Sequence, residues 1–422
     1  MIFNLAYGKT GYLIRLPDSY NIDVFEPRWI NSVRDQSLAV TEAIRNPYNS
    51  RPLKEVAGRD DKVAIIFSDI TRATPYNIIM PALLNELKDI PRENICLFCA
   101  NGTHRRVTDR ELTSILGETI FNNYEIVQND ANDPGLFTLV GKTSSGNDIF
   151  INKKILGYDL KILTGFIEPH FFAGFSGGGK ALVPGLASEK SIKINHSVAN
   201  LSKDNVNWGI TAGNPLYEEI MEAAEFISGL FLLNITLNKN KEITNVFAGD
   251  LRTAHKAGCK FAKESAMVPV SRLYDIVITS NSGYPLDLNI YQTVKGMHAA
   301  AQIVKEGGSI IMAAECWDGI PADSDYEKIL TTVSNTDSLM DYIISNEFLL
   351  KDTWQIYYQA LIQKKADVYF FSDRLDESTI RRAHFKPVAD IAVLVDDLVK
   401  KTGPDAGICI LPEGPQTIPY LS

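Results

Sequence analysis

The stretch KVAIIFSDITRATP, residues 62–75, predicts the fold of this chain. A nearly unbroken apolar run ends in a polar loop, and Pro75 then begins a helical pattern that reaches Leu87. The same order returns at ICLFCA (95–100), which precedes a helix beginning at Thr108, where Thr108 and Glu111 spell a capping box. Buried strands that alternate with helices are typical of a parallel sheet covered on both faces.

The alternation continues along the chain and begins again near Tyr274. Further strands are predicted at 124–128, 160–166, 275–280, 308–315, 366–373 and 407–414, and a hairpin is predicted at 231–249. Ser188, Asn214 and Asp250 are predicted to cap helices. We therefore predict two α/β domains with largely parallel sheets covered by helices. The N-terminal domain spans residues 1–268 and the C-terminal domain spans 272–409, with the tail at about 410–422 as a candidate to pack back on the N-terminal domain.

Composition indicates which kinds of partner and which cellular compartment to expect. The 422 residues carry a net charge of −9, which argues against nonspecific nucleic-acid binding but not against a local site for a small anion. The N-terminus lacks the pattern of a signal peptide, and no apolar window reaches the length of a membrane helix, about 18 residues. Five cysteines form an odd, sparse set, which favours reduced thiols and a cytoplasmic location.

Ligands of open α/β sheets bind beyond the carboxyl ends of the strands, and a cleft between two such domains is the expected site. This rule selects four loops: SDITRATP (68–75), NGTHRR (101–106), EPHFFAGFSGGGK (168–180) and NSGYPLDLNIYQ (281–292). His104, His170 and His196 fall on these loops or on the helix after them. The remaining histidines, His255, His298 and His384, are interpreted as surface residues or as residues placed at helix C-termini.

The glycine-rich loop is spelled almost as a P-loop. Gly174 to Lys180 reads GxxxxGK, but Ala181 replaces the hydroxyl residue that would hold magnesium, and seven residues separate Gly174 from the strand at 160–166. Gly177, Gly178 and Gly179 would let backbone N–H groups approach an anion closely. Lys180, beside glycines and aromatics, is a candidate for a desolvated nucleophile.

Two further groups have both a functional and a structural interpretation. Arg72 could bind a carboxylate or phosphate as a fork, or Asp69 and Thr74 could cap turns while Arg72 pairs locally. Gln292 and Lys295, three apart on a predicted helix, share one face and by themselves would be an ordinary polar face.

Taken together, these residues resemble the nickel-dependent lactate racemase family. The matching pieces are Asp69 and Arg72 in SDITRATP, His104 in NGTHR, His170 to Lys180 in EPHFFAGFSGGGK, His196 in INHSVAN, Gln292 and Lys295 in YQTVKG, and Trp354 in KDTWQ. The resemblance runs in order over nearly the whole chain, and the EPHFFAGFSGGGK block followed by an Asn-His pair is its most specific part.

The resemblance implies a nickel-pincer nucleotide, the nickel complex of a pyridinium-3,5-bisthiocarboxylic acid mononucleotide, which an apo preparation would lack. Its nickel is bound by two sulfurs and a ring carbon. By the same resemblance, Lys180 is joined to the cofactor as a thioamide, His196 is the fourth nickel ligand, and His104 and His170 are the acid/base pair. Arg72, Gln292 and Lys295 hold the substrate carboxylate, while Asp69 and Trp354 support that site.

The function expected from these residues is racemisation or epimerisation of lactate or a related 2-hydroxy acid by reversible hydride transfer to the cofactor. The expected partners are the small substrate and the cofactor maturation enzymes, with no nucleic acid and no membrane. We further hypothesise that Gly177, Gly178 and Gly179 cradle the phosphate of the mononucleotide. The alternatives are a P-loop-like NTPase and a non-catalytic nickel- or nucleotide-binding protein.

Overall fold

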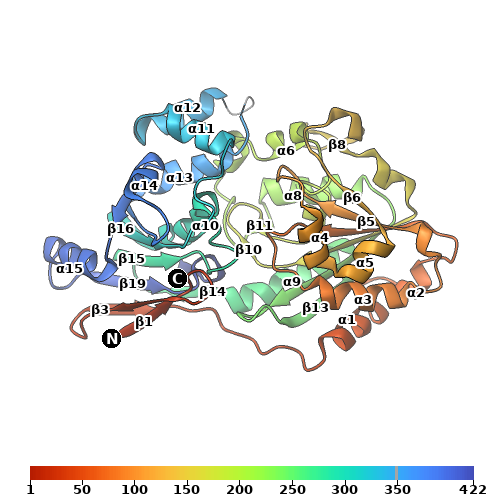
Figure 1. The fold of residues 1–422 in the computed structure, drawn as a ribbon, viewed down its shortest axis with the longest axis horizontal. Coiled ribbons are helices and arrows are strands. Elements are labelled where there is room, and N and C mark those ends of the chain that lie inside the picture. The colour runs from red at the N-terminus through yellow and green to blue at the C-terminus, as the bar shows by residue number, and fades with distance from the viewer. Residues whose placement is uncertain (347–349) are drawn as a thin grey trace. The chain divides into compact units, whose positions relative to one another are not determined.

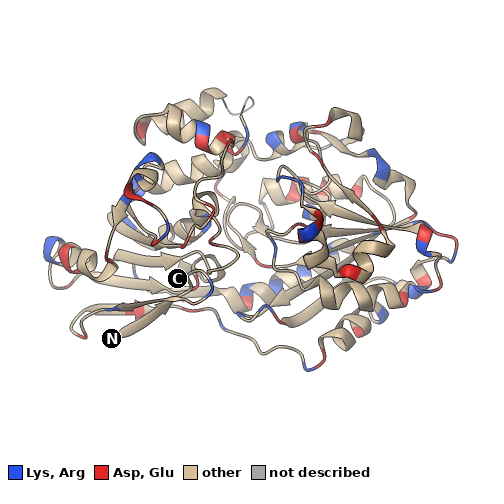
Figure 2. Cartoon of the chain, viewed as in Figure 1, with Lys and Arg blue, Asp and Glu red and all other residues tan. Residues whose placement is uncertain are grey.

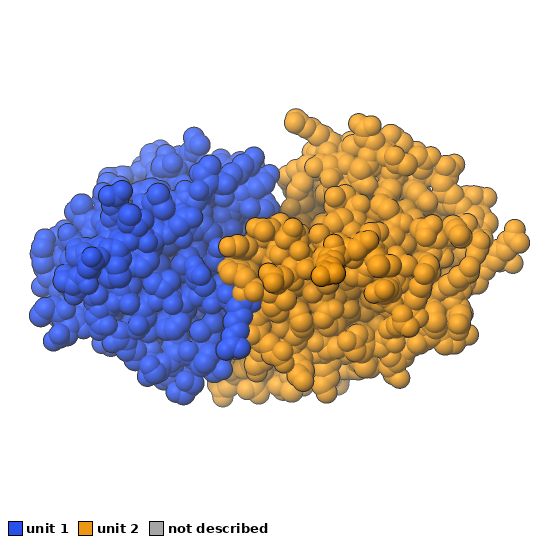
Figure 3. Space-filling view, turned by 90° about the horizontal axis from the view of Figure 1, so that it is seen from below, with its two compact units in different colours: residues 1–28, 197–199, 266–422 blue, residues 29–196, 200–265 orange. Residues whose placement is uncertain are grey.

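The computed structural model describes residues 1–346 and 350–422, and the chain divides into two compact units (Figures 1 and 3). Unit 1 holds residues 1–28, 197–199 and 266–422, and unit 2 holds residues 29–196 and 200–265. Each unit contains a largely parallel sheet with helices, so the predicted α/β fold class is confirmed.

Unit 2 is built on a six-stranded sheet of order β13-β12-β9-β4-β5-β6. These strands are β4 (Val63–Ser68), β5 (Ile95–Ala100), β6 (Glu125–Gln128), β9 (Leu160–Phe166), β12 (Leu230–Leu237) and β13 (Ile243–Gly249). All neighbours pair in parallel except β12 and β13, which form the predicted hairpin. In the central register, Ile65 of β4 lies opposite both Leu97 of β5 and Ile162 of β9.

Residues 63–67 of β4 are apolar without alternation, and all of them are buried, so the sheet is covered on both faces at this strand. Val63, Ile65 and Phe67 pack into a core with helices α1 (Gln36–Arg45), α3 (Tyr76–Glu86) and α4 (Asp109–Leu116). Helix α8 (Pro215–Glu225) and the short 3₁₀ helix η4 (Gly178–Ala181) pack together, and η4 also contacts β4 and β9. The other elements here are α2 (Leu53–Val56), α5 (Glu118–Asn123), β7 (Phe137–Lys142), β8 (Asp148–Asn152), β10 (Pro169–His170), β11 (Gly174–Phe175), α6 (Glu189–Asn195) and α9 (Leu251–Ala266); α7 (Val198–Leu201) follows α6 in the chain.

Unit 1 is built on a second six-stranded sheet, of order β18-β17-β16-β15-β19-β3, in which every pair is parallel. Its strands are β3 (Asn21–Val24), β15 (Tyr274–Ser280), β16 (Val304–Ala313), β17 (Asp367–Phe371), β18 (Lys386–Val388) and β19 (Gly407–Leu411). The helices are α10 (Ile290–Ala301), α11 (Asp325–Thr332), α12 (Asp337–Asn346), α13 (Thr353–Lys365), α14 (Glu377–Arg382) and α15 (Ile391–Thr402). Two small ladders complete it: the N-terminal hairpin of β1 (Ile2–Leu5) and β2 (Tyr12–Arg15), and the parallel pair of β14 (Met267–Val270) and β20 (Ile418–Leu421).

The predicted domain limits are wrong at both ends of the chain. Residues 1–28 belong to unit 1, because β3 pairs in parallel with β19, with Ile22 opposite Ile408. The tail beyond residue 410 also stays in unit 1, where β20 pairs with β14. A short strand such as NIDV carries no information about which sheet it joins, since pairing partners are set by tertiary contacts.

Charged residues of both signs are interspersed along the helices and loops of each unit (Figure 2). Within the described residues, none of the helices combines the length and the hydropathy that a bilayer-spanning helix needs.

The predicted helix caps are confirmed, and Asn214 is the most deeply buried of them. Its side-chain oxygen accepts from the backbone N–H groups of Leu216 (3.1 Å) and Tyr217 (3.3 Å). Its amide nitrogen donates to the carbonyls of Phe172 (2.7 Å) and Ile210 (3.0 Å). Asn214 therefore joins the start of α8 to the loop that carries His170.

We expect Asn214→Ala to lower the free energy of unfolding by about 2–3 kcal/mol, because it removes a helix cap and leaves buried carbonyls without donors. Urea denaturation of the apo chain measures the change. Asp35→Ala is the matched control: Asp35 caps α1 through one solvent-exposed bond to Leu38, so its loss should cost about 1 kcal/mol or less. Equal losses for the two variants would contradict this assignment.

Candidate active site

Three of the four selected loops leave the same edge of the unit 2 sheet. They follow β4, β5 and β9, which are adjacent and parallel in the order β9-β4-β5. The loop after β5 also contacts the segment after the glycine-rich loop, where the Gly102 N–H donates to the Gly185 carbonyl at 3.0 Å. The sheet thus brings Asp69, His104 and His170 to neighbouring strand ends.

A hydrogen bond joins the buried carboxylate of Asp69 to the partly exposed imidazole of His104. The Asp69 Oδ2 lies 2.6 Å from His104 Nδ1, with the carboxylate nearly inaccessible and the imidazole 36% exposed. Burial alone would raise the pKa of Asp69, but the charge and hydrogen bond of His104, then Arg72 and Thr71, outweigh it and hold the pKa below its ordinary value. The ionised carboxylate fixes Nδ1 of His104 as the protonated nitrogen, so Nε2 is the nitrogen able to accept a proton when the ring is neutral.

Arg72 lies in the turn that Asp69 caps. Thr71 donates to Asp69 Oδ1 from its backbone N–H (3.0 Å) and from its hydroxyl (2.6 Å), and Arg72 donates to the Thr71 hydroxyl at 3.0 Å. The interpretation in which Asp69 caps a turn and Arg72 pairs locally therefore describes the structure. It does not conflict with a carboxylate-binding role, because the guanidinium has five donors.

The ring of Phe172 contacts the remaining predicted site residues of unit 2 outside the glycine-rich turn. Its ring centroid lies 4.4 Å from that of His170 and 4.8 Å from that of His196, both edge to face, and the Lys180 Nζ lies 5.3 Å from its centroid. Phe172 was not among the predicted site residues, although its position two residues after His170 was the available signal. One aromatic ring thus contacts three of the four residues that the resemblance ties to the cofactor and the proton transfer.

His196 has the electrostatics of a neutral ligand. Burial, and then the nearby charge of Lys180, lower the pKa of His196 to about 3. The residue ends α6, and the preceding Asn195 donates to the buried carboxylate of Glu219 at 2.8 Å, which fixes this end of the helix. The imidazole is therefore neutral at physiological pH, as metal coordination requires.

His170 is held in a defined tautomer by its own loop. The Ala173 N–H donates to His170 Nδ1 at 3.3 Å within the small β10–β11 hairpin. Because Nδ1 accepts, the proton of the neutral ring is on Nε2. In their neutral forms, Nε2 would therefore be a donor in His170 and an acceptor in His104.

The glycine-rich loop is shaped by close packing. A side chain on Gly177 would come within 2.4 Å of Asn234 Oδ1, and one on Gly178 within 2.8 Å of the His255 ring. Both glycines have positive φ, 75° and 58°. Lys180 lies in the four-residue η4, not at the start of an α-helix as in a P-loop, so the geometry does not support the NTPase alternative.

The packing of Gly178 and Gly179 adds little support to the prediction that this loop holds a phosphate. The Gly178 N–H is already used, donating to Asn234 Oδ1 at 2.8 Å, and Gly179 packs on α8, where an added side chain would come 3.1 Å from the Ile220 carbonyl. A role for Gly177, Gly178 and Gly179 in holding the phosphate stays a prediction.

Gln292, Lys295 and Trp354 lie in unit 1. Lys295 donates to Gln292 Oε1 at 3.0 Å on the first turns of α10, so the shared face is confirmed. Trp354 lies in the first turn of α13 and donates to the Tyr291 hydroxyl at 3.2 Å, which braces the residue next to Gln292. Their contribution to the site stays a prediction.

The interpretation of the other histidines is wrong for His255. It lies in the first half of α9 and is 1% exposed, with Nε2 2.9 Å from the Ser176 carbonyl. His298 does lie in the last turn of α10, but it is buried rather than on the surface. His384 follows α14 and contacts the Leu330 carbonyl through Nε2 at 2.8 Å.

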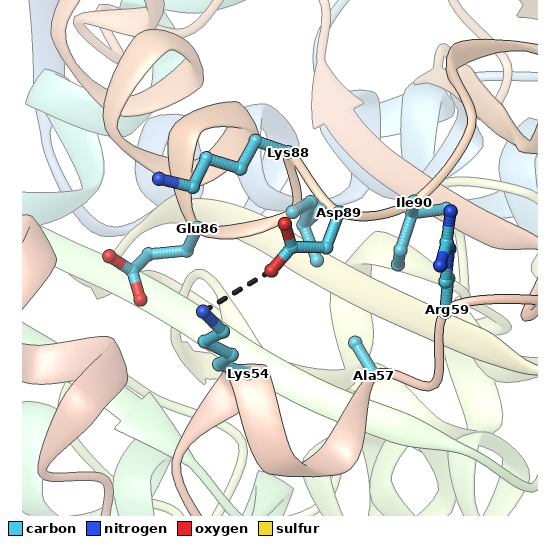
Figure 4. A pocket seen from close by; sticks show the side chains of 8 residues that line it. Lys54, Ala57, Arg59, Glu86, Lys88, Asp89 and Ile90 are labelled. Carbon is cyan, nitrogen blue, oxygen red and sulfur yellow. Dashed lines mark ion pairs between the residues drawn. The ribbon is translucent and has the colours of Figure 1, made fainter.

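A charged pocket lies elsewhere in unit 2. It has a volume of about 610 Å³ and is lined by Lys54, Ala57, Arg59, Glu86, Leu87, Lys88, Asp89 and Ile90 (Figure 4). Arg59 precedes β4 and Ile90 precedes β5, so the pocket faces the amino ends of the strands, opposite the site loops. Among residues 1–346 and 350–422, no group of three or more His, Cys, Asp or Glu side chains is placed to hold a metal.

Comparison with known proteins decides the family. The model described as "Lactate racemase N-terminal domain" matches residues 7–209, and the one described as "Lactate racemase C-terminal domain" matches residues 270–418. The chain belongs to the lactate racemase family. A racemase is an isomerase, so the predicted enzyme class is confirmed together with the resemblance.

Two lactate racemases show how closely the family's sequences agree. The lactate racemase of Lactiplantibacillus plantarum is 38% identical over 91% of each chain. The lactate racemase of Thermoanaerobacterium thermosaccharolyticum is 33% identical over 98% of each chain.

The fold also matches two solved structures. The lactate racemase apoprotein from T. thermosaccharolyticum superposes with a TM-score of 0.91, at 33% identity, over 99% of this chain and all of that one. A protein from Thermotoga maritima shares the fold with a TM-score of 0.72 at 18% identity, over 93% of this chain and all of that one.

The buried histidines predict a pH dependence of stability. Burial, against the Ser176 hydrogen bond, lowers the pKa of His255 to about 4, and burial followed by the charge of Lys365 lowers that of His298 to about 3. Because the unfolded chain takes up these protons near pH 6.5, the free energy of unfolding should fall as pH falls from 6.5 to 4, by up to about 1.4 kcal/mol per pH unit for each residue. Denaturation of the apo chain at pH 7.5 and 5 measures it.

His255→Gln and His298→Gln should each make the free energy of unfolding less dependent on pH between 7.5 and 5, because each variant lacks one of the two buried histidines. Between pH 7.5 and 8.5 the variants should show the same slope as the original chain, because both histidines are neutral in either state. An unchanged slope between pH 7.5 and 5 in both variants would contradict the prediction.

Proposed function

We propose that this chain racemises lactate or a related 2-hydroxy carboxylate by reversible hydride transfer, with a lysine-tethered nickel-pincer nucleotide as its cofactor. The observation that carries the proposal is the set of contacts around Phe172, which joins His170, His196 and Lys180. The Asp69–His104 pair follows neighbouring strands of the same sheet edge. Both named relatives are lactate racemases, which supports the same substrate class.

The residues present fit such a cofactor. Lys180 is half-buried against an aromatic ring, where an amine is a suitable nucleophile for a thio-acid group. Burial and the nearby charge of Lys180 lower the pKa of His196, so its neutral imidazole can supply one nitrogen ligand to nickel. When bound, the cofactor supplies a cationic acceptor for the hydride at the α-carbon of the substrate.

The two loop histidines are suited to opposite proton transfers. When its ring is neutral, His104 can accept a proton at Nε2, because Asp69 holds the proton on Nδ1, and neutral His170 can donate a hydrogen bond from Nε2, because the Ala173 N–H donates to Nδ1. One ring, as neutral imidazole, can take the hydroxyl proton of a 2-hydroxy acid, and the other, as imidazolium, can return a proton to the oxygen of the 2-keto acid, so that the two rings exchange protonation states over the reaction. The exchange of roles makes the reaction reversible between the two enantiomers.

Arg72, Gln292 and Lys295 would hold the substrate carboxylate. Arginine binds a carboxylate through two parallel hydrogen bonds, and lysine adds a point charge. A fixed carboxylate lets the α-carbon invert while the rest of the substrate stays in place. Asp69 and Trp354 act through their neighbours, by orienting His104 and by bracing Tyr291. The maturation enzymes that assemble the cofactor are the protein partners that this proposal requires.

Isotope retention tests the hydride route. Lactate labelled with deuterium at C2 should keep its label when the holoenzyme racemises it in ordinary water, because a hydride returns to the carbon from which it left. Chiral chromatography with mass detection measures inversion and label together. Inversion accompanied by loss of the label to solvent would indicate proton abstraction at carbon and overturn the proposal.

Replacing the tether tests the cofactor. In chain produced together with the maturation enzymes, Lys180→Ala should abolish the added mass and reduce racemisation by about 10³-fold or more, since the hydride acceptor is lost. Lys190→Ala is the matched control, because Lys190 also lies over a phenylalanine ring, 4.9 Å from Phe150, on the surface of α6. Intact mass, nickel content and a panel of enantiopure 2-hydroxy acids are the readouts.

The same preparations separate the alternatives. An unmodified, nickel-free chain that still racemises would overturn the tether, and Lys180-dependent hydrolysis of ATP with magnesium would favour an NTPase. Nickel binding without turnover of any 2-hydroxy acid would favour a non-catalytic binding protein.

A further inference from the structure

A buried polar clamp holds the turn that precedes Lys180. His255 lies on α9 and Asn234 on β12, and their side chains meet the backbone of residues 176–178 from two different elements. Asn234 Oδ1 accepts from the Gly178 N–H at 2.8 Å, and His255 Nε2 lies 2.9 Å from the Ser176 carbonyl. Lys180 follows two residues after Gly178, so the direction of its side chain depends on this turn.

The hydrogen-bond chemistry of His255 is fixed by its partners. A carbonyl only accepts, so Nε2 of His255 carries the proton that is donated to Ser176. Nδ1 is then the acceptor, and the Tyr217 hydroxyl lies 3.2 Å from it with the two rings stacked. Tyr217 belongs to α8, which packs on η4, so the imidazole links α8, α9 and the glycine-rich loop.

The imidazole also explains why residue 178 is a glycine. A side chain there would lie 2.8–3.0 Å from three atoms of the His255 ring, closer than real contacts of this kind. The ring therefore packs directly on the backbone of Gly178, whose φ of 58° is costly for other residues. The loop takes this left-handed turn because a ring and an amide occupy the space around it.

We propose that His255 is a positioning residue for Lys180: its hydrogen bond to Ser176 and its ring against Gly178 fix the turn that aims the lysine amine at the cofactor. This inference rests on the proposed function only for the identity of the group that Lys180 receives. His255 touches neither the amine nor the substrate, and it acts through the backbone of residues 176–178. The neutral state that burial imposes on the imidazole keeps the required donor in place over the physiological pH range.

Three variants of the full-length chain test the proposal. His255→Leu has similar bulk but no hydrogen bonds, His255→Gln can donate to Ser176 and accept from Tyr217, and His384→Leu is the matched control. His384 also contacts a backbone carbonyl through Nε2, at Leu330 in unit 1. Thermal unfolding verifies that each variant is folded, and Tyr217→Phe serves as a milder substitute if His255→Leu is not.

The first readout is amide hydrogen exchange of the apo chain over residues 174–182. We expect exchange about tenfold faster in His255→Leu, the change that matches loss of one buried hydrogen bond, and near-original rates in His255→Gln and His384→Leu. The second readout is the fraction of chain that carries the mass adduct at Lys180 after production with the maturation enzymes. It should fall about tenfold in His255→Leu and recover in His255→Gln.

Unchanged exchange and unchanged adduct in a folded His255→Leu chain would overturn the proposal, as would equal losses in His384→Leu. Failure of the proposed function looks different. In that case the original chain itself carries no adduct at Lys180, while the exchange experiment on the apo chain still reports whether His255 fixes the turn.

Discussion

The site depends on the parallel pairing of β4 with β5 on one side and β9 on the other. Neighbouring strands of a sheet lie about 4.8 Å apart, so the ends of β5 and β9 are separated by about 10 Å with β4 between them. Parallel direction then brings all three carboxyl ends to one edge, and with them Asp69, His104 and His170. A single antiparallel strand in the middle would send its loop to the opposite edge and separate Asp69 from His104.

The glycine-rich loop answers a different constraint. Its glycines allow the backbone to pass between Asn234 and His255 and against α8, at distances that no side chain permits. In a nucleotide-triphosphate P-loop the glycines face the ligand, whereas here they face the interior of unit 2. The lysine, not the loop backbone, is the group presented beside Phe172 and His196.

Protonation in this region is set by partners that differ from one histidine to the next. A carboxylate accepts from Nδ1 of His104 and holds the proton on that nitrogen, a backbone N–H donates to Nδ1 of His170, and burial beside Lys180 keeps His196 neutral. Three imidazoles with the same intrinsic chemistry thereby differ in their hydrogen-bond partners and in the nitrogen that carries the proton. Packing of the loops, rather than the residue type, sets these differences.

The sequence alone determined the alternation of strands and helices, the caps at Thr108, Ser188, Asn214 and Asp250, and the family, because these follow from local periodicity and from motifs of specific spelling. Only the tertiary structure decided where β3 and the tail belong, since a four-residue strand does not encode its neighbour. It also decided the contacts of Phe172 with Lys180 and of His255 with Gly178. Neither contact follows from local sequence, because the residues of each pair come from different elements.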